Sequence, residues 1–233
     1  MTDEVALTRV VTDFARLLVS DYHVSDALHH LVEGVTEVLD ISGAGVSLAE
    51  GDRLEFATAA NEPVSRLERI QEDAQEGPCL DAHRSGQTVL VADLADDPAR
   101  WPALSRSASH IGSLAVAGLP MSLNGTSLGA LNLYDFKRHD WSKEEVGAAR
   151  LLADVATGYV TNASRIAEVR RTTEQLQKAL DSRVLIEQAK GVLAGERHMS
   201  VDESFELLRA HARSHNASLH SVAEAVVNLR LRL

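Results

Sequence analysis

Basic side chains near the C-terminal end have the spacing of a phosphate-binding surface. Arg183 and Lys190 are seven residues apart in a segment, 181–195, whose pattern predicts a helix, so they project from nearly the same side of it. Arg209 on the next predicted helix can join them. Such side chains make many of the phosphate contacts in nucleic-acid complexes. From spacing alone an ordinary solvated helix face is the more common explanation, and both interpretations stay open at this point.

The same C-terminal region holds two further signals. Gly191 stands inside the predicted helix, where glycine is unfavourable, and this suggests that another backbone, of protein or of RNA, approaches closely there. The last 70 residues contain no Trp or Tyr, so planar groups that stack on bases would have to be arginines or histidines. The rings we considered are His198, His211, His215 and His220. Each of them is more often a surface residue than a base platform.

Residue patterns typical of catalysis are missing from the sequence. We find no nucleophile beside a base, no phosphate-cradling glycine loop and no cluster of metal ligands. His211 and His215 have the i, i+4 spacing of a metal pair, but no carboxylate or thiol pattern completes a site. Cys79 is the only cysteine, which excludes an intramolecular disulfide. It is a redox sensor, a bilin attachment point or, most commonly, a small core or turn residue. We therefore expect no catalytic residues, no metal and no cofactor.

The charge is divided unevenly along the chain. The net charge is −11 over 233 residues, but residues 1–160 carry −13 and residues 161–233 carry +2. The net charge of the C-terminal part is therefore compatible with a phosphate-binding site, although a charge of +2 alone would not predict one. No apolar run reaches the roughly 18 residues of a membrane span. The N-terminal residues lack the basic start of a signal peptide. We expect a cytoplasmic protein with no membrane partner.

The first 141 residues predict an α+β domain with one mainly antiparallel sheet flanked by helices. Apolar residues recur at helical spacing over 3–20 and 25–39. Two hairpins follow from strand-like segments, one across 50–53 and one across Asn124-Gly125, which is the strongest short-range turn signal of the chain. A segment at 88–94 predicts a buried strand, and further helices are expected over 63–74, within 77–86 and up to about 110.

From Ser142 to about Gly195 nothing breaks the helical pattern. Nine positions in steps of three and four form a heptad seam that a second copy of the chain can bury, so we expect a coiled-coil homodimer. A helix of about 50 residues would be roughly 75 Å long, too long to pack within one small domain. Beyond Gly195, Ser200 with Glu203 predicts a capping box, and Ser218 or Asn216 can cap a further helix, which completes a three-helix unit. The seam consists of Leu152, Val155, Tyr159, Asn162, Ile166, Val169, Thr173, Leu176 and Leu180.

The C-terminal segment resembles the ANTAR domain family. The run SRVLIEQAKGVL at 182–193 carries most of the likeness, together with Phe205, the Leu-Leu-Arg triplet at 207–209 and Val-Ala at 222–223. The resemblance implies binding of paired hairpins in nascent RNA, antitermination of transcription, and RNA polymerase as a further partner. Mapped onto this chain, it implies that the RNA contacts are made by Arg183, Gln188, Lys190, Gly191 and Arg209.

The N-terminal part resembles a GAF domain of the type that precedes ANTAR domains in actinobacteria. The likeness is carried by EGPCLDA at 76–82, by RWP at 100–102 and by LGALNLY at 128–134. It implies a sensor of a small ligand or of a signalling state. The candidate ligand-binding residues are Cys79, Asp81, Arg84, Trp101 and Tyr134.

These expectations combine into one organisation. A GAF-like sensor domain at 1–141 is followed by a helical coiled-coil linker at 142–179 and by an all-α, three-helix ANTAR RNA-binding domain at 180–233. The alternative is a module whose C-terminal helices bind a protein partner without RNA, which the small positive charge favours. DNA binding through a helix-turn-helix fits less well, since the last predicted helix has few polar side chains able to read a groove.

Overall fold

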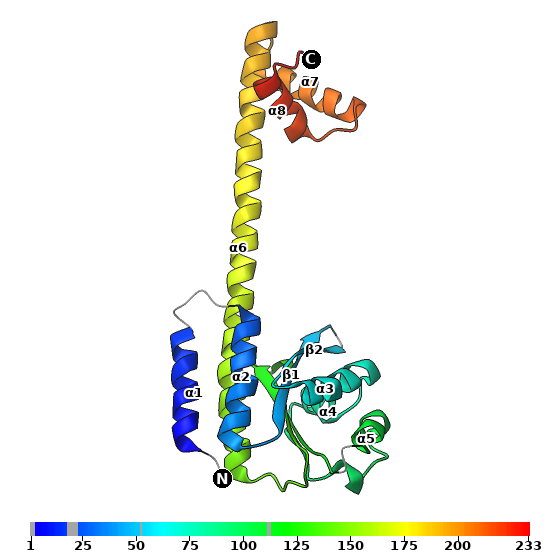
Figure 1. Cartoon of the computed structure of the whole chain (residues 1–233). Coiled ribbons are helices and arrows are strands. Elements are labelled where there is room, and N and C mark those ends of the chain that lie inside the picture. Colours follow the sequence, from blue (N-terminus) through cyan, green and yellow to red (C-terminus); the bar gives the residue numbers. More distant parts are fainter. Residues whose placement is uncertain (1–2, 18–22, 52, 111–112) are drawn as a thin grey trace. The chain divides into compact units, whose positions relative to one another are not determined.

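The computed structural model describes residues 3–17, 23–51, 53–110 and 113–233, which fall into two compact units, Met1–Ser164 and Arg165–Leu233. The helix α6 (Lys143–Arg197) contributes residues to both units (Figure 1). This helix is 55 residues long, as the unbroken helical pattern predicted. Within the described residues, none of the helices combines the length and apolar content needed to cross a membrane.

The first unit is built on a five-stranded antiparallel sheet, which confirms the predicted α+β class. Its order is β2-β1-β5-β4-β3, and the two predicted hairpins are its β1–β2 and β4–β5 pairs. In the turn between β4 and β5, Asn124 has φ 52° and Gly125 φ 81°, the left-handed conformations that the Asn-Gly pair favours. The strands are β1 (Gly43–Glu50), β2 (Arg53–Ala59), β3 (Val89–Val91), β4 (Ala115–Leu123) and β5 (Thr126–Asp135).

Strand β3 corrects one prediction. The segment 88–94 was expected to be a buried strand, but β3 has three residues and lies at the edge of the sheet. Leu90 is 47% exposed there, and the chain turns into a short 3-10 helix, η1 (Leu94–Asp96). An apolar run cannot distinguish a central strand from a half-exposed edge strand, because that depends on which strands pair with it.

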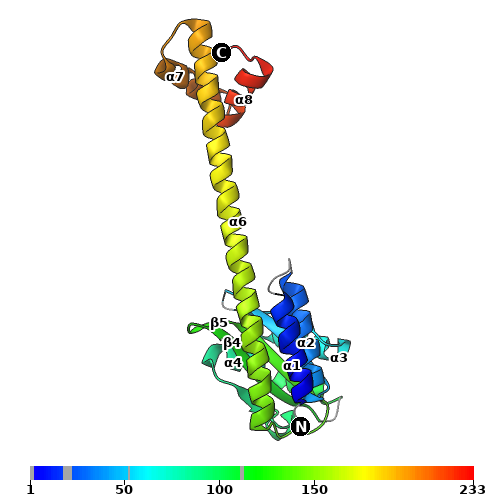
Figure 2. The same ribbon diagram turned by 90° about the vertical axis from the view of Figure 1, so that its left-hand side faces the viewer.

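Helices cover both faces of this sheet. One face packs against α2 (Val24–Leu39) and the first part of α6, and α1 (Glu4–Leu17) packs against these two helices; the three helices lie side by side in Figure 2. The other face packs against α3 (Glu62–Ala74), α4 (Pro78–Ser85) and α5 (Pro102–Ala108). Alternation along β5 explains the two layers: Leu131 and Leu133 face α2 and α6, whereas Ala130 and Tyr134 face the other helices.

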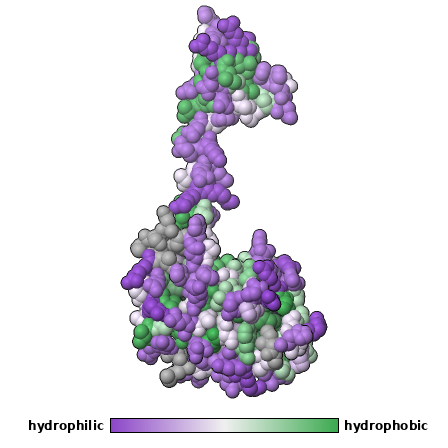
Figure 3. All heavy atoms as spheres, in the orientation of Figure 1, coloured by the Kyte–Doolittle hydropathy of each residue, from purple (hydrophilic) through white to green (hydrophobic). Residues whose placement is uncertain are grey.

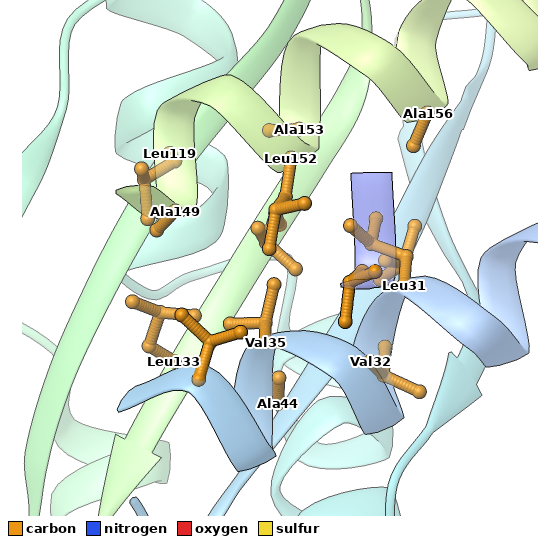
Figure 4. Packing of buried hydrophobic residues seen from close by; sticks show 14 of the residues in the cluster. Leu31, Val32, Val35, Ala44, Leu119, Leu133, Ala149, Leu152, Ala153 and Ala156 are labelled. Atoms are coloured by element: carbon orange, nitrogen blue, oxygen red, sulfur yellow. The ribbon is translucent and has the colours of Figure 1, made fainter. Parts of the chain in front are cut away.

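The core between α2, α6 and the sheet positions the first turns of α6. Leu152 projects from α6 toward Val35 of α2, above Leu133 of the sheet (Figure 4). Farther along α6, the ring of Tyr159 meets Phe14 of α1 edge to face, with 5.3 Å between the ring centroids. The start of α6 is fixed by a reciprocal cap, in which Ser142 N–H donates to Glu145 Oε2 at 2.8 Å and Glu145 N–H donates to Ser142 Oγ at 3.2 Å.

The predicted heptad seam has two different environments. Leu152 and Tyr159 are buried within the first unit, so they pack inside the chain and are not available to a second copy. From Ile166 onward the apolar seam residues are exposed: Ile166 is 43% exposed, Val169 65%, Leu176 67% and Leu180 56%. The first part of the repeat therefore packs inside the first unit, and only its second part is exposed.

The second unit is a small helical bundle formed by the end of α6, α7 (Val201–Ser214) and α8 (Leu219–Leu229). The predicted capping box of Ser200 and Glu203 is confirmed at the start of α7, and Ser218 caps α8. Hydrophobic residues gather over this unit in Figure 3. Its buried core consists of Ala189, Leu193, Leu208, Ala212, Val222, Ala223 and Val226.

Candidate nucleic-acid interface and sensor core

The second unit brings two of the predicted RNA-binding cations onto one aromatic ring. The Lys190 ammonium of α6 stands 5.4 Å from the centroid of the Phe205 ring, and the Arg209 guanidinium of α7 stands 5.7 Å from it. Phe205 and Arg209 are four residues apart and so share a face of α7. The bundle packing brings Lys190 to this face from the neighbouring helix.

Both cations also pair with a carboxylate of their own helix. Lys190 Nζ lies 2.8 Å from Glu187, and Arg209 lies 2.8 Å from Glu206. The side chain of Lys190 is 14% exposed, whereas that of Arg209 is 47% exposed. The Arg209–Glu206 pair is exposed at both partners, and such pairs contribute only about 0–1 kcal/mol.

The other predicted contact residues lie apart from this ring. Arg183 and Gln188 are exposed and line a shallow surface hollow of about 500 Å³ together with Leu180, Val184 and Glu187. Gly191 is exposed, and apart from its chain neighbours and the backbone of its own helix no atom of the described residues comes within 4 Å of where a Cβ would sit. The close approach predicted at Gly191 therefore stays a prediction about another molecule.

The histidines of this unit form no metal cluster among the described residues. His211 and His215 stack on each other, with ring centroids 4.0 Å apart and planes inclined by 20°. His215 Nδ1 lies 3.1 Å from the backbone oxygen of His211. Their i, i+4 spacing thus serves a contact along one helix.

A buried polar network lies under the sheet of the first unit. The carboxylate of Glu68 on α3 accepts hydrogen bonds from Tyr134 (2.7 Å), Ser47 (2.8 Å) and Asn132 (2.9 Å). Glu68, Asn132 and Tyr134 are wholly buried. Burial raises the pKa of Glu68, and the three donated hydrogen bonds oppose that rise only in part.

Gln71 extends this network to Cys79. Its Nε2 donates to the Tyr134 hydroxyl at 2.6 Å, and its Oε1 lies 3.1 Å from the Cys79 sulfur. Gly77, at φ 136°, leaves room for the Gln71 amide, since a Cβ there would overlap Gln71 Oε1. Burial, and then the Glu68 charge, raise the pKa of the Cys79 thiol well above its usual range. A neutral, enclosed thiol is a poor nucleophile, which supports the interpretation of Cys79 as a core residue.

Four of the five candidate ligand residues of the first unit form two pairs, and the fifth, Arg84, lies in neither. Cys79 and Tyr134 belong to the buried network just described. Trp101 is buried beneath Arg100, whose guanidinium lies 4.2 Å from the Trp101 ring and 2.9 Å from Asp81. Trp101 and Arg100 border a surface pocket of about 230 Å³ beside η1. Arg84 is exposed at the end of α4.

Sequence reasoning missed three groups of residues. It used Phe205 only as a mark of family likeness, although its i, i+4 spacing with Arg209 was a usable signal. It passed over the network partners Glu68 and Asn132, which are 64 residues apart and carry no local signature. It also passed over His139, which the structure places between two carboxylates at the start of α6.

Comparison with known proteins identifies both parts of the chain. Residues 22–159 match the GAF domain family, and residues 174–227 match the ANTAR domain family. No curated protein sequence gives a significant match.

Solved GAF-fold structures resemble the first part of the chain. The GAF domain of an Acinetobacter phosphoenolpyruvate-protein phosphotransferase is 14% identical, with a TM-score of 0.56 over 69% of this chain and 93% of that one. The corresponding GAF domain from Coxiella burnetii is 16% identical, with a TM-score of 0.54 over 70% and 98%. A free methionine-R-sulfoxide reductase from Neisseria meningitidis, solved with its substrate, is 17% identical, with a TM-score of 0.54 over 72% and 96%. At these identities the likeness shows the fold alone.

The two families define a general role. GAF domains are signal-sensing modules and ANTAR domains are RNA-binding antitermination modules; both families are regulatory, although some proteins of GAF fold are enzymes. The GAF match covers more than half of the chain, and the ANTAR match follows it. The chain therefore belongs to the GAF domain family and, with an ANTAR domain after its GAF domain, has the domain order of a GAF-ANTAR regulator.

Proposed function

We propose that this protein is a signal-responsive regulator that binds stem-loops in nascent RNA and prevents termination of transcription. The observation that carries the proposal is the meeting of Lys190 and Arg209 on Phe205 within the ANTAR match. Phosphate contacts from these cations and from Arg183 hold the RNA, while Gln188 and Gly191 lie on the exposed side of the same helix. RNA polymerase is the further partner through which binding acts on transcription.

The GAF domain supplies the signal in this proposal. A small ligand or a change of state there alters dimerisation, the register of α6 or the exposure of the ANTAR helices. The division into a sensor at 1–141, a coiled-coil linker at 142–179 and an RNA-binding domain at 180–233 describes these three roles, with the first turns of the linker packed against the sensor. The protein acts by binding and not by catalysis, which is consistent with an enclosed Cys79 thiol.

A homodimer is part of the same proposal. The exposed apolar residues Ile166, Val169, Leu176 and Leu180 recur at heptad spacing on α6. A second α6 can bury this stripe and present two ANTAR domains, as binding to paired hairpins requires.

A low-salt RNA-binding assay on the full chain tests the RNA face. We expect the double variant Lys190→Ala, Arg183→Ala to bind an RNA hairpin at least about tenfold more weakly and with a shallower salt dependence, since fewer phosphates are neutralised. Arg171→Ala on α6 is the matched control, because it also removes an exposed cation but lies before both the ANTAR match and the proposed RNA-binding domain. Unchanged affinity in the double variant would show that the assigned face is wrong.

A second candidate is a protein-binding module without RNA contact. The hollow lined by Leu180 and Val184 favours it, because Val184 is 50% exposed and the hollow is largely apolar. Salt distinguishes the two candidates: phosphate contacts weaken steeply as salt rises, whereas an apolar docking surface does not.

A further inference from the structure

Phe205 is an aromatic ring placed outside the apolar core of its own domain. It is the only aromatic residue, among Phe, Trp and Tyr, in 165–233. The core of the second unit is built from alanine, valine and leucine, with Leu185, Ile186 and Leu219 among the partly buried residues packed against it; Phe205 is in neither group. The ring is half-buried and meets two cations. Packing of the bundle therefore does not account for this position.

The surroundings of the ring match those of single-stranded nucleic-acid sites. Such sites combine aromatic faces on which unpaired bases stack with cations that follow the phosphate backbone. Here the cations come from two helices, Lys190 from α6 and Arg209 from α7, and both lie within 6 Å of the ring centroid. The histidines considered earlier offer no comparable arrangement, since His211 and His215 stack on each other.

We propose that Phe205 is the base-stacking residue of the RNA site, where it receives one unpaired base of a hairpin loop while Lys190 and Arg209 hold the flanking phosphates. This inference rests on the proposed RNA-binding function and adds that the protein recognises an unpaired base of the loop. Phe205 takes the place of the histidines as the expected base platform.

Arg209 gives the base access to the ring. Its side chain is about half exposed, and its ion pair with Glu206 is a surface pair of the kind that contributes little. A phosphate draws Arg209 away from the ring and from Glu206, and the base takes the vacated ring surface. Lys190 is less exposed and keeps its position beside Phe205.

The test compares two RNA probes on the full chain. The first is a hairpin with an adenine-rich loop in which one adenine is replaced by the fluorescent base 2-aminopurine, and the second is a fully paired duplex of the same length. We expect Phe205→Leu, which keeps an apolar side chain, to weaken hairpin binding about 5- to 150-fold, equivalent to about 1–3 kcal/mol for one stacked base. Duplex binding and the salt dependence should change little, because no phosphate contact is lost. Phe205→Trp should restore hairpin binding and the quenching of 2-aminopurine.

Two controls separate the possible outcomes. Leu207→Ala removes a half-buried apolar side chain from the same helix and should leave the hairpin-to-duplex ratio unchanged. If Phe205→Leu binds the hairpin as tightly as the wild type while Lys190→Ala weakens both probes, the stacking role is wrong and the RNA-binding function stands. If the wild type binds neither probe at low salt, the proposed function itself fails.

Discussion

His139 Nε2 lies 3.2 Å from Glu145 Oε1, so a ring that follows β5 is joined to the first turn of α6. The other ring nitrogen, Nδ1, lies 2.8 Å from Asp135 Oδ2 at the end of β5. The His139 side chain is only 16% exposed and stacks on Trp141, with ring centroids 4.3 Å apart. His139 therefore connects β5, which supplies part of the buried Glu68 network, to α6, the helix that continues into the ANTAR domain.

We expect this contact to make the stability of the GAF domain depend on pH. Burial lowers the pKa of His139, but its hydrogen bonds to Asp135 and Glu145 outweigh burial and raise the pKa above its usual value. A raised histidine pKa stabilises the fold fully below the unfolded value of about 6.5, and this stabilisation is lost as the pH rises through the folded value. The pKa of Glu145 is lowered because its hydrogen bonds to Ser142 and His139 outweigh burial, so its contribution is lost as the pH falls through its folded value.

The variant His139→Gln should flatten the alkaline side of this profile. At pH 6 it should lose about 1.5–3 kcal/mol, the range for hydrogen bonds to charged groups, and at pH 8.5 clearly less. Urea unfolding followed by tryptophan fluorescence measures both. His30→Gln, at an exposed position on α2, is the control. Parallel pH profiles for the wild type and His139→Gln would contradict the assignment.

Neighbouring leucines of α6 should respond very differently to truncation. Leu152 is fully buried between α2 and the sheet, whereas Leu151 is 46% exposed. Leu152→Ala leaves a cavity and should reduce the free energy of unfolding of the GAF domain by about 2–5 kcal/mol. Leu151→Ala should cost less than about 1 kcal/mol, in line with the small effects of surface substitutions. Equal losses in urea unfolding would show that the burial pattern of α6 is different.

Replacement of Glu68 by glutamine should destabilise the GAF domain although the two side chains have the same shape. The hydrogen bonds from Ser47, Asn132 and Tyr134 need acceptor oxygens, and the amide of glutamine presents N–H groups to some of these donors. An unsatisfied buried polar group costs about 1–3 kcal/mol. The exposed Glu62→Gln on the same helix is the control for thermal unfolding. A Glu68→Gln protein as stable as this control would argue against the assignment of both Glu68 carboxyl oxygens as acceptors of these hydrogen bonds.

The proposed homodimer should depend on the exposed stripe of α6. Leu176→Glu with Leu180→Glu places charges at positions that are 67% and 56% exposed in the single chain, and burial of these charges in a seam is unfavourable. Sedimentation equilibrium should show a monomer. Gln175→Glu adds a charge away from the stripe and should leave the dimer intact. If the wild type sediments as a monomer at every concentration, the dimer proposal fails.

Local features of the sequence were sufficient to predict most elements of the fold. Asn124-Gly125 adopts the left-handed turn that its residue types favour, and Ser200 with Glu203 caps α7 as expected. The strand-like segments on either side of this turn predicted the paired strands β4 and β5. These features depend on backbone preferences and periodicity within a few residues, so they can be read without knowing the rest of the chain.

The partners of those elements were decided only by the tertiary structure. Leu152 and Leu176 belong to one heptad pattern, yet one is buried against α2 and the other is exposed, because a repeat specifies an apolar face and not what covers it. Glu68 meets Tyr134 across 66 residues of chain, and Phe205 meets Lys190 from another helix. Contacts of this kind arise from the path of the folded chain, whereas the sequence by itself determined most of the segments that form helices, strands and turns.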